Sequence, residues 1–486
     1  MTKGKIIRKL WKPVLLVSCI SLLCAGGAFV YHFYYLFSNS NTLFSWRHAW
    51  VDHLDMYTDA WEYEPGTEVQ VFVSNSEADP LQLRLIGLPD FDTLFVRKNI
   101  PSAYQPVHDS AAVAGAGWEP TFQWRLAADL PTGWYMLEVE AEADKRRTSI
   151  FITPQKEGVR KPLAWLMSTN TWNAYNHWGG QSLYSRNHTH QISFNRPQLA
   201  ADPLMENTYE NHQLYFQGAN IELPLARLLK EANIPFDVYS MDELHRSAEK
   251  LAQYQTLMFS THPEYWTWSM MHHLNQVLDS GRSALFLGGN TAAHVTYMDL
   301  EARTERVYKK QANLWHTKDT AGIRPFGIEF HYLGFHTYAP YEVRVDTSWL
   351  LAGTGLKKGD RFGFESESYD YTYAKTNLWR NLWGLTQKGR KGMASGLEID
   401  RVNQLTPDSW LTVAEGLNPA QDGHGEVFPE DFSWDGAAGA QIGYYWHPEG
   451  GLIFHTGSIS FTGAIPYDAP LRQIVLNAIR KCTDLE

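Results

Sequence analysis

Residues 163–167 have the sequence LAWLM, and three similar apolar runs follow: FDVY at 236–239, TLMF at 256–259 and ALFL at 284–287. Short continuous apolar runs of this kind are typical of buried strands. Between them, apolar residues recur at helical spacing over 223–229 and 270–278. Because alternating buried strands and helices are typical of parallel βαβ units, we expect an α/β domain with a parallel sheet over residues 159–486.

The preceding part of the chain has a different rhythm. Valines alternate over 69–73 and leucines over 81–85, and the triplets EPG at 64–66 and PTG at 131–133 supply turns. Period-two alternation bounded by turn residues is typical of short antiparallel strands. We therefore expect a β-sandwich domain over residues 45–158.

The amino end combines basic residues with a long apolar run. Residues 13–37 are predominantly apolar and long enough to span a bilayer. The basic residues before this run are Lys3, Lys5, Arg8, Lys9 and Lys12. Residues 1–44 are thus expected to form a cytoplasmic basic flank and a transmembrane helix. A cleavable signal peptide competes, although no A-x-A-like site follows. The expected localisation is a single-pass inner (plasma) membrane protein with its bulk periplasmic or extracellular.

Composition excludes some classes of protein and of metal site. The 486 residues carry a net charge of -11, which argues against a nucleic-acid partner because such proteins need a basic face. The three cysteines are Cys19, Cys24 and Cys482. Since two of them lie in the apolar run, a Cys-rich zinc site or disulfide framework cannot form, and a metal ion would need oxygen and nitrogen ligands.

Polar and aromatic residues follow three of the expected strands. The segments are NTWNAYNHWGGQSLYSRN at 170–187, THPEYW at 261–266 and GGN at 288–290. Ligands of open parallel sheets bind beyond the carboxyl ends of the strands, so the three segments are expected to face one crevice. Tyr175, Tyr184 and Glu264 would offer oxygen ligands for a hard cation, and His262 could transfer protons near Asn290.

These segments, together with SLY at 182–184, SFNRP at 193–197 and GLEID at 396–400, carry a resemblance. In this order the strings resemble the catalytic domain of the large (beta) subunit of N,N-dimethylformamidase and its relatives, over about residues 160–480. The resemblance implies an α/β fold similar to class I glutamine amidotransferases. It also implies a mononuclear ferric iron (Fe3+) in place of the cysteine nucleophile of those enzymes.

The resemblance assigns a role to each candidate residue. It implies that Tyr175, Tyr184 and Glu264 bind the metal. It further implies that His262 and Asn290 position or polarise the substrate carbonyl. Glu398 of the GLEID string would be a general acid or base. Zinc remains open on geometry alone, although phenolate oxygens and a hard cation suit each other better.

Each candidate also has a plain structural explanation. The tyrosines could be half-buried packing residues. Glu264 could cap the helix expected from about residue 270, because acidic side chains favour helix starts. His262 could simply hold a loop by hydrogen bonds.

The two remaining candidates have similar alternatives. Asn290 could cap a following helix through its side-chain oxygen. Glu398 could form an ordinary ion pair with Arg401.

Three function classes follow. The first is a membrane-anchored, extracytoplasmic, metal-dependent hydrolase of C–N amide bonds, an amidohydrolase acting on a small-molecule or glycan-linked amide. The second is a glycan-active envelope hydrolase, and the third is a non-catalytic envelope scaffold or binding module. Whether the chain is an enzyme therefore stays open, as does a homo-oligomeric state.

Overall fold

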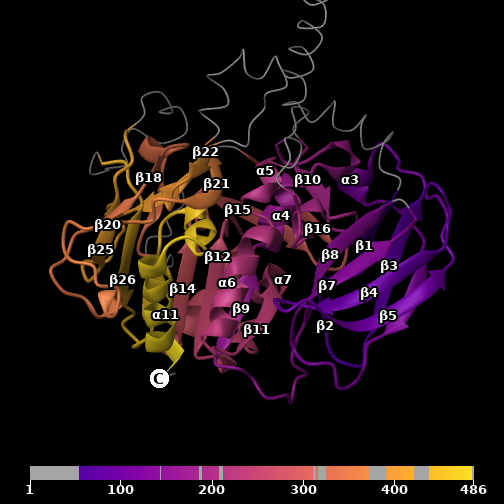
Figure 1. Cartoon of the computed structure of the whole chain (residues 1–486), viewed down its shortest axis with the longest axis horizontal. Helices are drawn as coiled ribbons and strands as arrows, with labels where there is room; N and C mark the ends of the chain where they lie inside the picture. Colours follow the sequence, from indigo (N-terminus) through magenta and orange to yellow (C-terminus); the bar gives the residue numbers. More distant parts are fainter. Residues whose placement is uncertain are drawn as a thin grey trace, which may run out of the picture.

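The computed structural model describes residues 54–483, except for 143, 185–188, 207–211, 310–313, 316–324, 371–389 and 421–436. Figure 1 shows a first part built from strands and a second part in which helices cover a large sheet. Strands predominate throughout the described residues, and helices are few.

The first part consists of two sheets around one core. The three-stranded sheet contains β1 (Leu54–Thr58), β3 (Glu68–Asn75) and β6 (Phe122–Arg125). The five-stranded sheet has the order β2 (Glu62–Tyr63), β8 (Lys145–Ile152), β7 (Gly133–Glu140), β4 (Leu81–Gly87) and β5 (Asp92–Ile100). Inward-facing residues of both sheets, among them Val71 and Leu137, form a shared apolar cluster. This is the alternation that the sequence shows in the same region.

The second part is built on a nine-stranded mixed sheet. Its first five strands are parallel: β11 (Phe236–Ser240), β9 (Leu163–Met167), β12 (Thr256–Thr261), β14 (Ser283–Gly288) and β27 (Leu452–His455). The last four pair antiparallel: β26 (Gln441–Trp446), β25 (Leu411–Gly416), β19 (Tyr341–Val343) and β20 (Arg361–Phe362). The four apolar runs expected to be strands therefore form β9, β11, β12 and β14.

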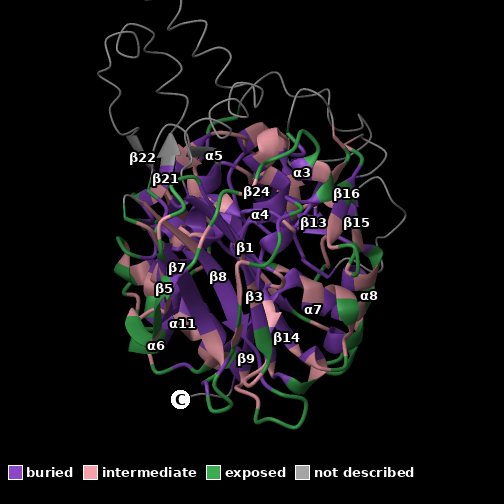
Figure 2. Ribbon diagram, turned by 90° about the vertical axis from the view of Figure 1, so that its right-hand side faces the viewer, coloured by how far each residue is buried: buried purple, intermediate pink, exposed green. Residues whose placement is uncertain are grey.

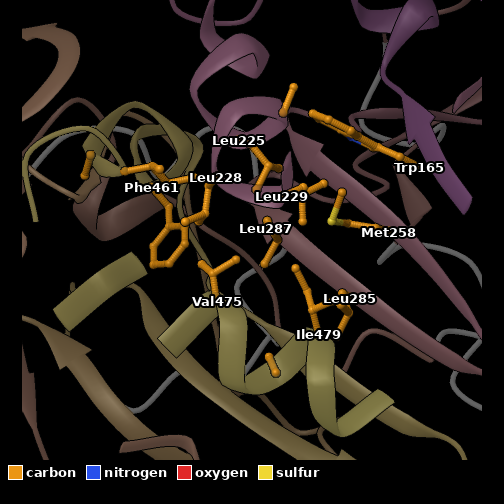
Figure 3. Packing of buried hydrophobic residues seen from close by; sticks show 14 of the residues in the cluster. Trp165, Leu225, Leu228, Leu229, Met258, Leu285, Leu287, Phe461, Val475 and Ile479 are labelled. Atoms are coloured by element: carbon orange, nitrogen blue, oxygen red, sulfur yellow. The ribbon is translucent and has the colours of Figure 1, made fainter. Parts of the chain in front are cut away.

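Helices cover both faces of the parallel half. On one face lie α6 (Ala219–Glu231) and α11 (Ala469–Thr483), whose apolar residues pack on Trp165, Met258 and Leu285, as Figure 3 shows. On the other face lie α7 (Met241–Arg246) and α8 (Trp268–Asp279), packed on residues such as Phe259 and Phe286. Because successive side chains of a strand point to opposite faces, two covered faces require continuous apolar runs. Figure 2 accordingly shows β9 and β14 as buried.

Shorter elements complete the described structure. A four-stranded sheet has the order β10 (Gln191–Ser193), β16 (Thr304–Val307), β15 (His294–Asp299) and β13 (Tyr265–Trp266). Two-stranded sheets pair β17 (Glu329–His331) with β24 (Ile399–Arg401), β18 (Tyr338–Ala339) with β23 (Ser395–Gly396), and β21 (Ser366–Asp370) with β22 (Arg390–Gly392). The short helices are α3 (Ala111–Ala114), α4 (Thr169–Tyr175) and α5 (His212–Tyr215).

The predicted fold class is wrong. An α/β domain with a parallel sheet similar to class I glutamine amidotransferases is not what the structure shows, because the large sheet is mixed and strands dominate the chain. The alternation of strands and helices holds only as far as β14. Beyond Gly288 many strands have two to four residues, too few to show a periodic pattern. The predicted domain boundaries at 44/45 and 158/159 stay predictions.

The predicted localisation is also corrected. Within residues 54–483 and the gaps noted above, no helix combines the length and the apolar character needed to cross a bilayer. This finding contradicts the single-pass membrane protein expected from the sequence. The run at 13–37 that carried the expectation lies outside the described residues.

The same substitution should affect stability differently at a buried and at an exposed leucine. Leu285 in β14 is 0% exposed, so Leu285→Ala should lower the free energy of unfolding by about 2–5 kcal/mol because it leaves a cavity. Leu94 in β5 is 51% exposed, and Leu94→Ala should change the free energy of unfolding by less than about 0.5 kcal/mol. Urea denaturation measures both, and equal effects would contradict this description of the core.

Candidate active site

The carboxyl ends of three neighbouring parallel strands bring the candidate residues together. β9, β12 and β14 are adjacent, and Thr261 at the end of β12 pairs with Gly288 at the end of β14. Thr171 links the segments that follow β9 and β12. Its hydroxyl donates to the carbonyl oxygen of His262 at 2.6 Å and accepts from the backbone N–H of Glu264 at 3.3 Å. The segments therefore form one continuous edge, as expected for loops after parallel strands.

Close backbone contacts fix the segment after β14. A Cβ atom on Gly289 would lie 2.6 Å from the carbonyl oxygen of Glu398, so only glycine fits there. The next residue, Asn290, adopts a left-handed conformation with a φ of 52°. Its N–H donates to Asp400 Oδ1 at 2.7 Å, which holds the Asn290 side chain over the site. The glycine pair thus serves backbone packing.

Tyrosine and carboxylate oxygens gather at the centre of this edge. The hydroxyl of Tyr184 lies 3.2 Å from both carboxylate oxygens of Glu264 and 2.7 Å from the hydroxyl of Tyr265. The ring of Tyr175 stacks on that of Tyr184 with centroids 4.0 Å apart, and the Tyr175 hydroxyl interacts with Tyr184 and Glu264. The three residues predicted as metal ligands are therefore grouped in one cluster.

A histidine lies between two carboxylates beside this cluster. His262 Nε2 is 3.1 Å from Glu398 Oε2 and 3.3 Å from Glu264 Oε2, and Nδ1 is 2.7 Å from Gln217 Oε1. Because both ring nitrogens face acceptor oxygens, the geometry favours the doubly protonated ring. Asn290 Nδ2 donates to Glu398 Oε2 at 2.5 Å. All six predicted site residues thus lie together.

Charge interactions make His262 and Glu398 an ion pair. Burial lowers the pKa of His262, but the negative charges of Glu398 and Glu264 outweigh it, so this pKa lies above its ordinary value. Burial raises the pKa of Glu398, but the charge of His262 and the hydrogen bonds from His262 and Asn290 bring it below its ordinary value. An imidazolium next to an ionised carboxylate can donate and accept protons respectively.

The phenols are held neutral in the absence of a cation. Burial of the hydroxyl groups is the main cause that raises the pKa of Tyr175 and of Tyr184 well above 10, and the charge of Glu264 adds to it. Burial also raises the pKa of Glu264 above its ordinary value, against the opposing charges of His262 and Lys309. The pKa values of the neighbouring Glu264 and Glu398 are therefore shifted in opposite directions.

Two of the plain structural explanations are wrong. Glu264 does not cap a helix, because Thr267 is the N-cap of α8 and its hydroxyl accepts from the backbone of the first turn. Asn290 does not cap one either, because strand β15 follows it.

The ordinary ion pair of Glu398 with Arg401 that the sequence left open is also replaced by another arrangement. Glu398 contacts His262 and Asn290, whereas Arg401 Nη2 is 2.7 Å from Glu415 Oε1. The structure thus fixes where the predicted residues lie, while their roles remain predictions.

Three further residues contribute that the sequence patterns do not predict. Tyr265 adds a third hydroxyl and directly follows Glu264 in the HPEYW string, a position that could have drawn attention. His294 Nε2 lies 3.3 Å from Glu264 Oε1. The ammonium of Lys309 lies 2.8 Å from the centroid of the Tyr184 ring, and burial lowers the pKa of Lys309 to about 7. His294 and Lys309 belong to no quoted string.

Within the described part of the chain, no group of three or more His, Cys, Asp and Glu side chains could hold a metal ion. The set predicted here is of another kind, because two of its three members are tyrosines. Phenolate and carboxylate oxygens are ligands that hard cations prefer.

Comparison with known proteins gives a family match. A family model described as N,N-dimethylformamidase beta subunit-like, C-terminal, matches residues 94–471, which confirms the resemblance found in the sequence. Two curated relatives are N,N-dimethylformamidase beta subunits. The one from Alcaligenes sp is 23% identical over 427 residues, covering 75% of this chain and 54% of its own length. The one from Paracoccus aminophilus is 24% identical over 273 residues, covering 51% and 34%.

The chain spans about half the length of the first of these relatives. Among solved structures, the sporulation control protein Spo0M from Bacillus subtilis matches 21% of this chain and 49% of its own, with 18% identity and a TM-score of 0.15. A score this low carries no argument about the fold.

A buried acid beneath the site predicts how stability changes with pH. Glu222 in α6 is 0% exposed, and burial raises its pKa to about 7, against a smaller lowering by Ser260 and Thr261. The folded state therefore binds this proton more tightly than the unfolded state, so the contribution of Glu222 to the free energy of unfolding falls as the pH rises from about 4.5 to 7.

Glu222→Gln should remove this effect. At pH 8 the variant should be more stable than the parent by about 3 kcal/mol, because each unit of pKa shift corresponds to about 1.4 kcal/mol. The gain should disappear near pH 4. Urea denaturation across this range checks the gain. The matched control is Glu231→Gln, because Glu231 is the last residue of α6 and its side chain is 61% exposed. A gain that does not vary with pH would contradict the buried charge.

Proposed function

Because the chain belongs to the family of N,N-dimethylformamidase beta subunit-like C-terminal domains, we propose that it hydrolyses C–N amide bonds at the site around Glu264. The observation that carries this proposal is the cluster in which the Tyr184 hydroxyl lies 3.2 Å from both oxygens of Glu264, beside the pair of His262 and Glu398. It combines oxygen ligands for a cation with a proton donor and a proton acceptor.

The donor set fits a metal ion, and iron is the favoured choice. Tyr175, Tyr184 and Glu264 would hold it, because phenolate and carboxylate oxygens match a hard ferric ion, while zinc fits only on geometry. Deprotonation of the two phenols would accompany binding, since their pKa values are raised without a cation. When bound, the ion would supply Lewis acidity toward the amide carbonyl and lower the pKa of a bound water.

The residues of the chain would manage protons and orientation. The His262 ring, protonated in its pair with Glu398, would give a proton to the departing amine. Ionised Glu398 would accept the proton of the attacking water. Asn290 Oδ1 is buried and has no hydrogen-bond partner among the described residues, so it is free to accept from the substrate. Asn290 Nδ2 meanwhile keeps Glu398 oriented.

The names of the relatives bear on assembly. Both are beta subunits, a designation that implies a second kind of subunit in those enzymes. We include in the proposal that this chain works within an oligomer, and light scattering of the purified protein measures its state.

Removal of one ligand should change the colour of the iron-loaded protein. Phenolate-to-iron charge transfer should give a visible absorption band, and Tyr184→Phe should reduce it by roughly half, because one of two phenolate donors is lost. Tyr297→Phe alters a tyrosine that is 49% exposed on β15 and should leave the band unchanged. A colourless protein that takes up no iron would favour a non-catalytic module.

Loss of the proposed base should separate catalysis from metal binding. Glu398→Gln should lower kcat for formate release from N,N-dimethylformamide by ~10² to 10⁴, because a general base is removed. The iron content should stay the same, since Glu398 is not among the proposed ligands. Glu157→Gln, an exposed acid outside the site, is the control. Equal rates in the parent and Glu398→Gln would exclude this role.

A further inference from the structure

Lys309 reaches the site from the four-stranded sheet. It follows β16, in which Glu305 and Val307 are 0% exposed while the intervening Arg306 is exposed. Because side chains alternate along an extended chain, Lys309 continues the inward-facing row. Its ammonium lies 2.8 Å from the centroid of the Tyr184 ring. A basic side chain from a separate sheet is therefore held directly against a proposed metal ligand.

The ammonium of Lys309 lies among three aromatic rings and has no hydrogen-bond acceptor in the part of the chain that the structure describes. The rings of Tyr265 and Tyr175 have their centroids 5.5 Å and 6.0 Å from Nζ. Cation–π attraction stabilises such a placement, but it satisfies none of the three N–H donors. Among the described residues, no carboxylate oxygen lies within 4.0 Å of Nζ and no group accepts a hydrogen bond from it. The N–H groups of Lys309 are thus available to donate hydrogen bonds to a ligand.

Lys309 also lies on the accessible side of the cluster. Tyr184 is 40% exposed, whereas Glu264 and Tyr265 are only 3% and 1% exposed. The cluster is therefore more open to solvent at Tyr184, on whose ring the Lys309 ammonium rests, than at Glu264 and Tyr265.

We propose that Lys309 binds an anionic group of the substrate, so that the site takes amides with a carboxylate close to the scissile bond, of which N-acyl amino acids are the simplest. This inference rests on the proposed amide hydrolysis. In that reaction water adds to the acyl carbon, the C–N bond breaks, and the carboxylate and the protonated amine leave. A carboxylate is the complementary partner because it offers acceptor oxygens and a negative charge to unused N–H donors.

Two substrates that differ by one carboxylate test the proposal. N-formyl-N-methylglycine is N,N-dimethylformamide with a carboxylate in place of one methyl hydrogen, and both release formate on hydrolysis. For the parent protein, kcat/KM should be about tenfold to hundredfold higher for N-formyl-N-methylglycine, the range expected of one hydrogen bond to a charged group. Lys309→Met should lower the ratio of the two kcat/KM values at least tenfold, and Lys309→Arg should keep most of it.

Binding provides a second measurement that does not depend on turnover. Calorimetry should show that N-formyl-N-methylglycine binds the parent at least tenfold more tightly than it binds Lys309→Met. Lys358→Met, at a 56% exposed lysine on another surface, is the matched control and should behave as the parent does. Thermal melting shows whether each variant is folded.

The outcomes separate the two proposals. If neither compound is hydrolysed but Lys309-dependent binding is seen, the anion site stands and the proposed hydrolase function falls. If N,N-dimethylformamide is hydrolysed and Lys309→Met leaves the ratio and the binding unchanged, the anion site is overturned while the hydrolase function stands. Lack of measurable binding of N-formyl-N-methylglycine to the parent also overturns it.

Discussion

The parallel alignment of β9, β12 and β14 is the constraint on which the site depends. These strands are parallel neighbours in a fixed register. Leu166 of β9 pairs with Phe259 of β12, and Thr261 of β12 pairs with Gly288 of β14. A shift of one residue would exchange the two covered faces of a strand, which packing on both sides forbids. The register is therefore fixed by the core. The fixed register also fixes where the polar segments after these strands begin relative to one another.

Burial then gives different properties to chemically similar groups. Glu398 lies next to an imidazolium and accepts hydrogen bonds, which favours its ionised form. Glu264 lies among phenols and imidazoles, and burial dominates, so its pKa is raised. The two glutamates near His262 thus differ in their chemistry. Glu398 is ionised and can accept a proton, whereas the ionised form of Glu264 would be stabilised by a bound cation. This difference arises from neighbours and not from residue type.

The sequence predicts the parallel half of the sheet well and the rest poorly, for a physical reason. β9, β11, β12 and β14 are buried on both faces, so each leaves a continuous apolar run that is visible in isolation. β17, β18 and β23 have only two or three residues, and such short strands show no periodicity. Prediction of the site has the same limit. His262 and Asn290 directly follow recognisable apolar runs. Lys309 and His294 lie at the site because β15 pairs with β16, and no local sequence pattern predicts that pairing.

Glu398 nevertheless reaches the candidate site from outside the nine-stranded sheet, from between β23 and β24. Segment 396–401 is tied to the loop after β27, because the N–H of Asp400 donates to the carbonyl oxygen of Gly457 at 2.8 Å. The carboxylate of Asp400 accepts from the backbone of Asn290 and lies 3.3 Å from His455 Nε2 at the end of β27. β27 itself pairs parallel with β14 and antiparallel with β26, so it is the boundary of the two halves. The pair of His262 and Glu398 therefore joins the loop after β12 to a segment that is anchored at that boundary. The parallel strands alone supply the histidine, whereas the glutamate comes from a segment between two short strands of other sheets.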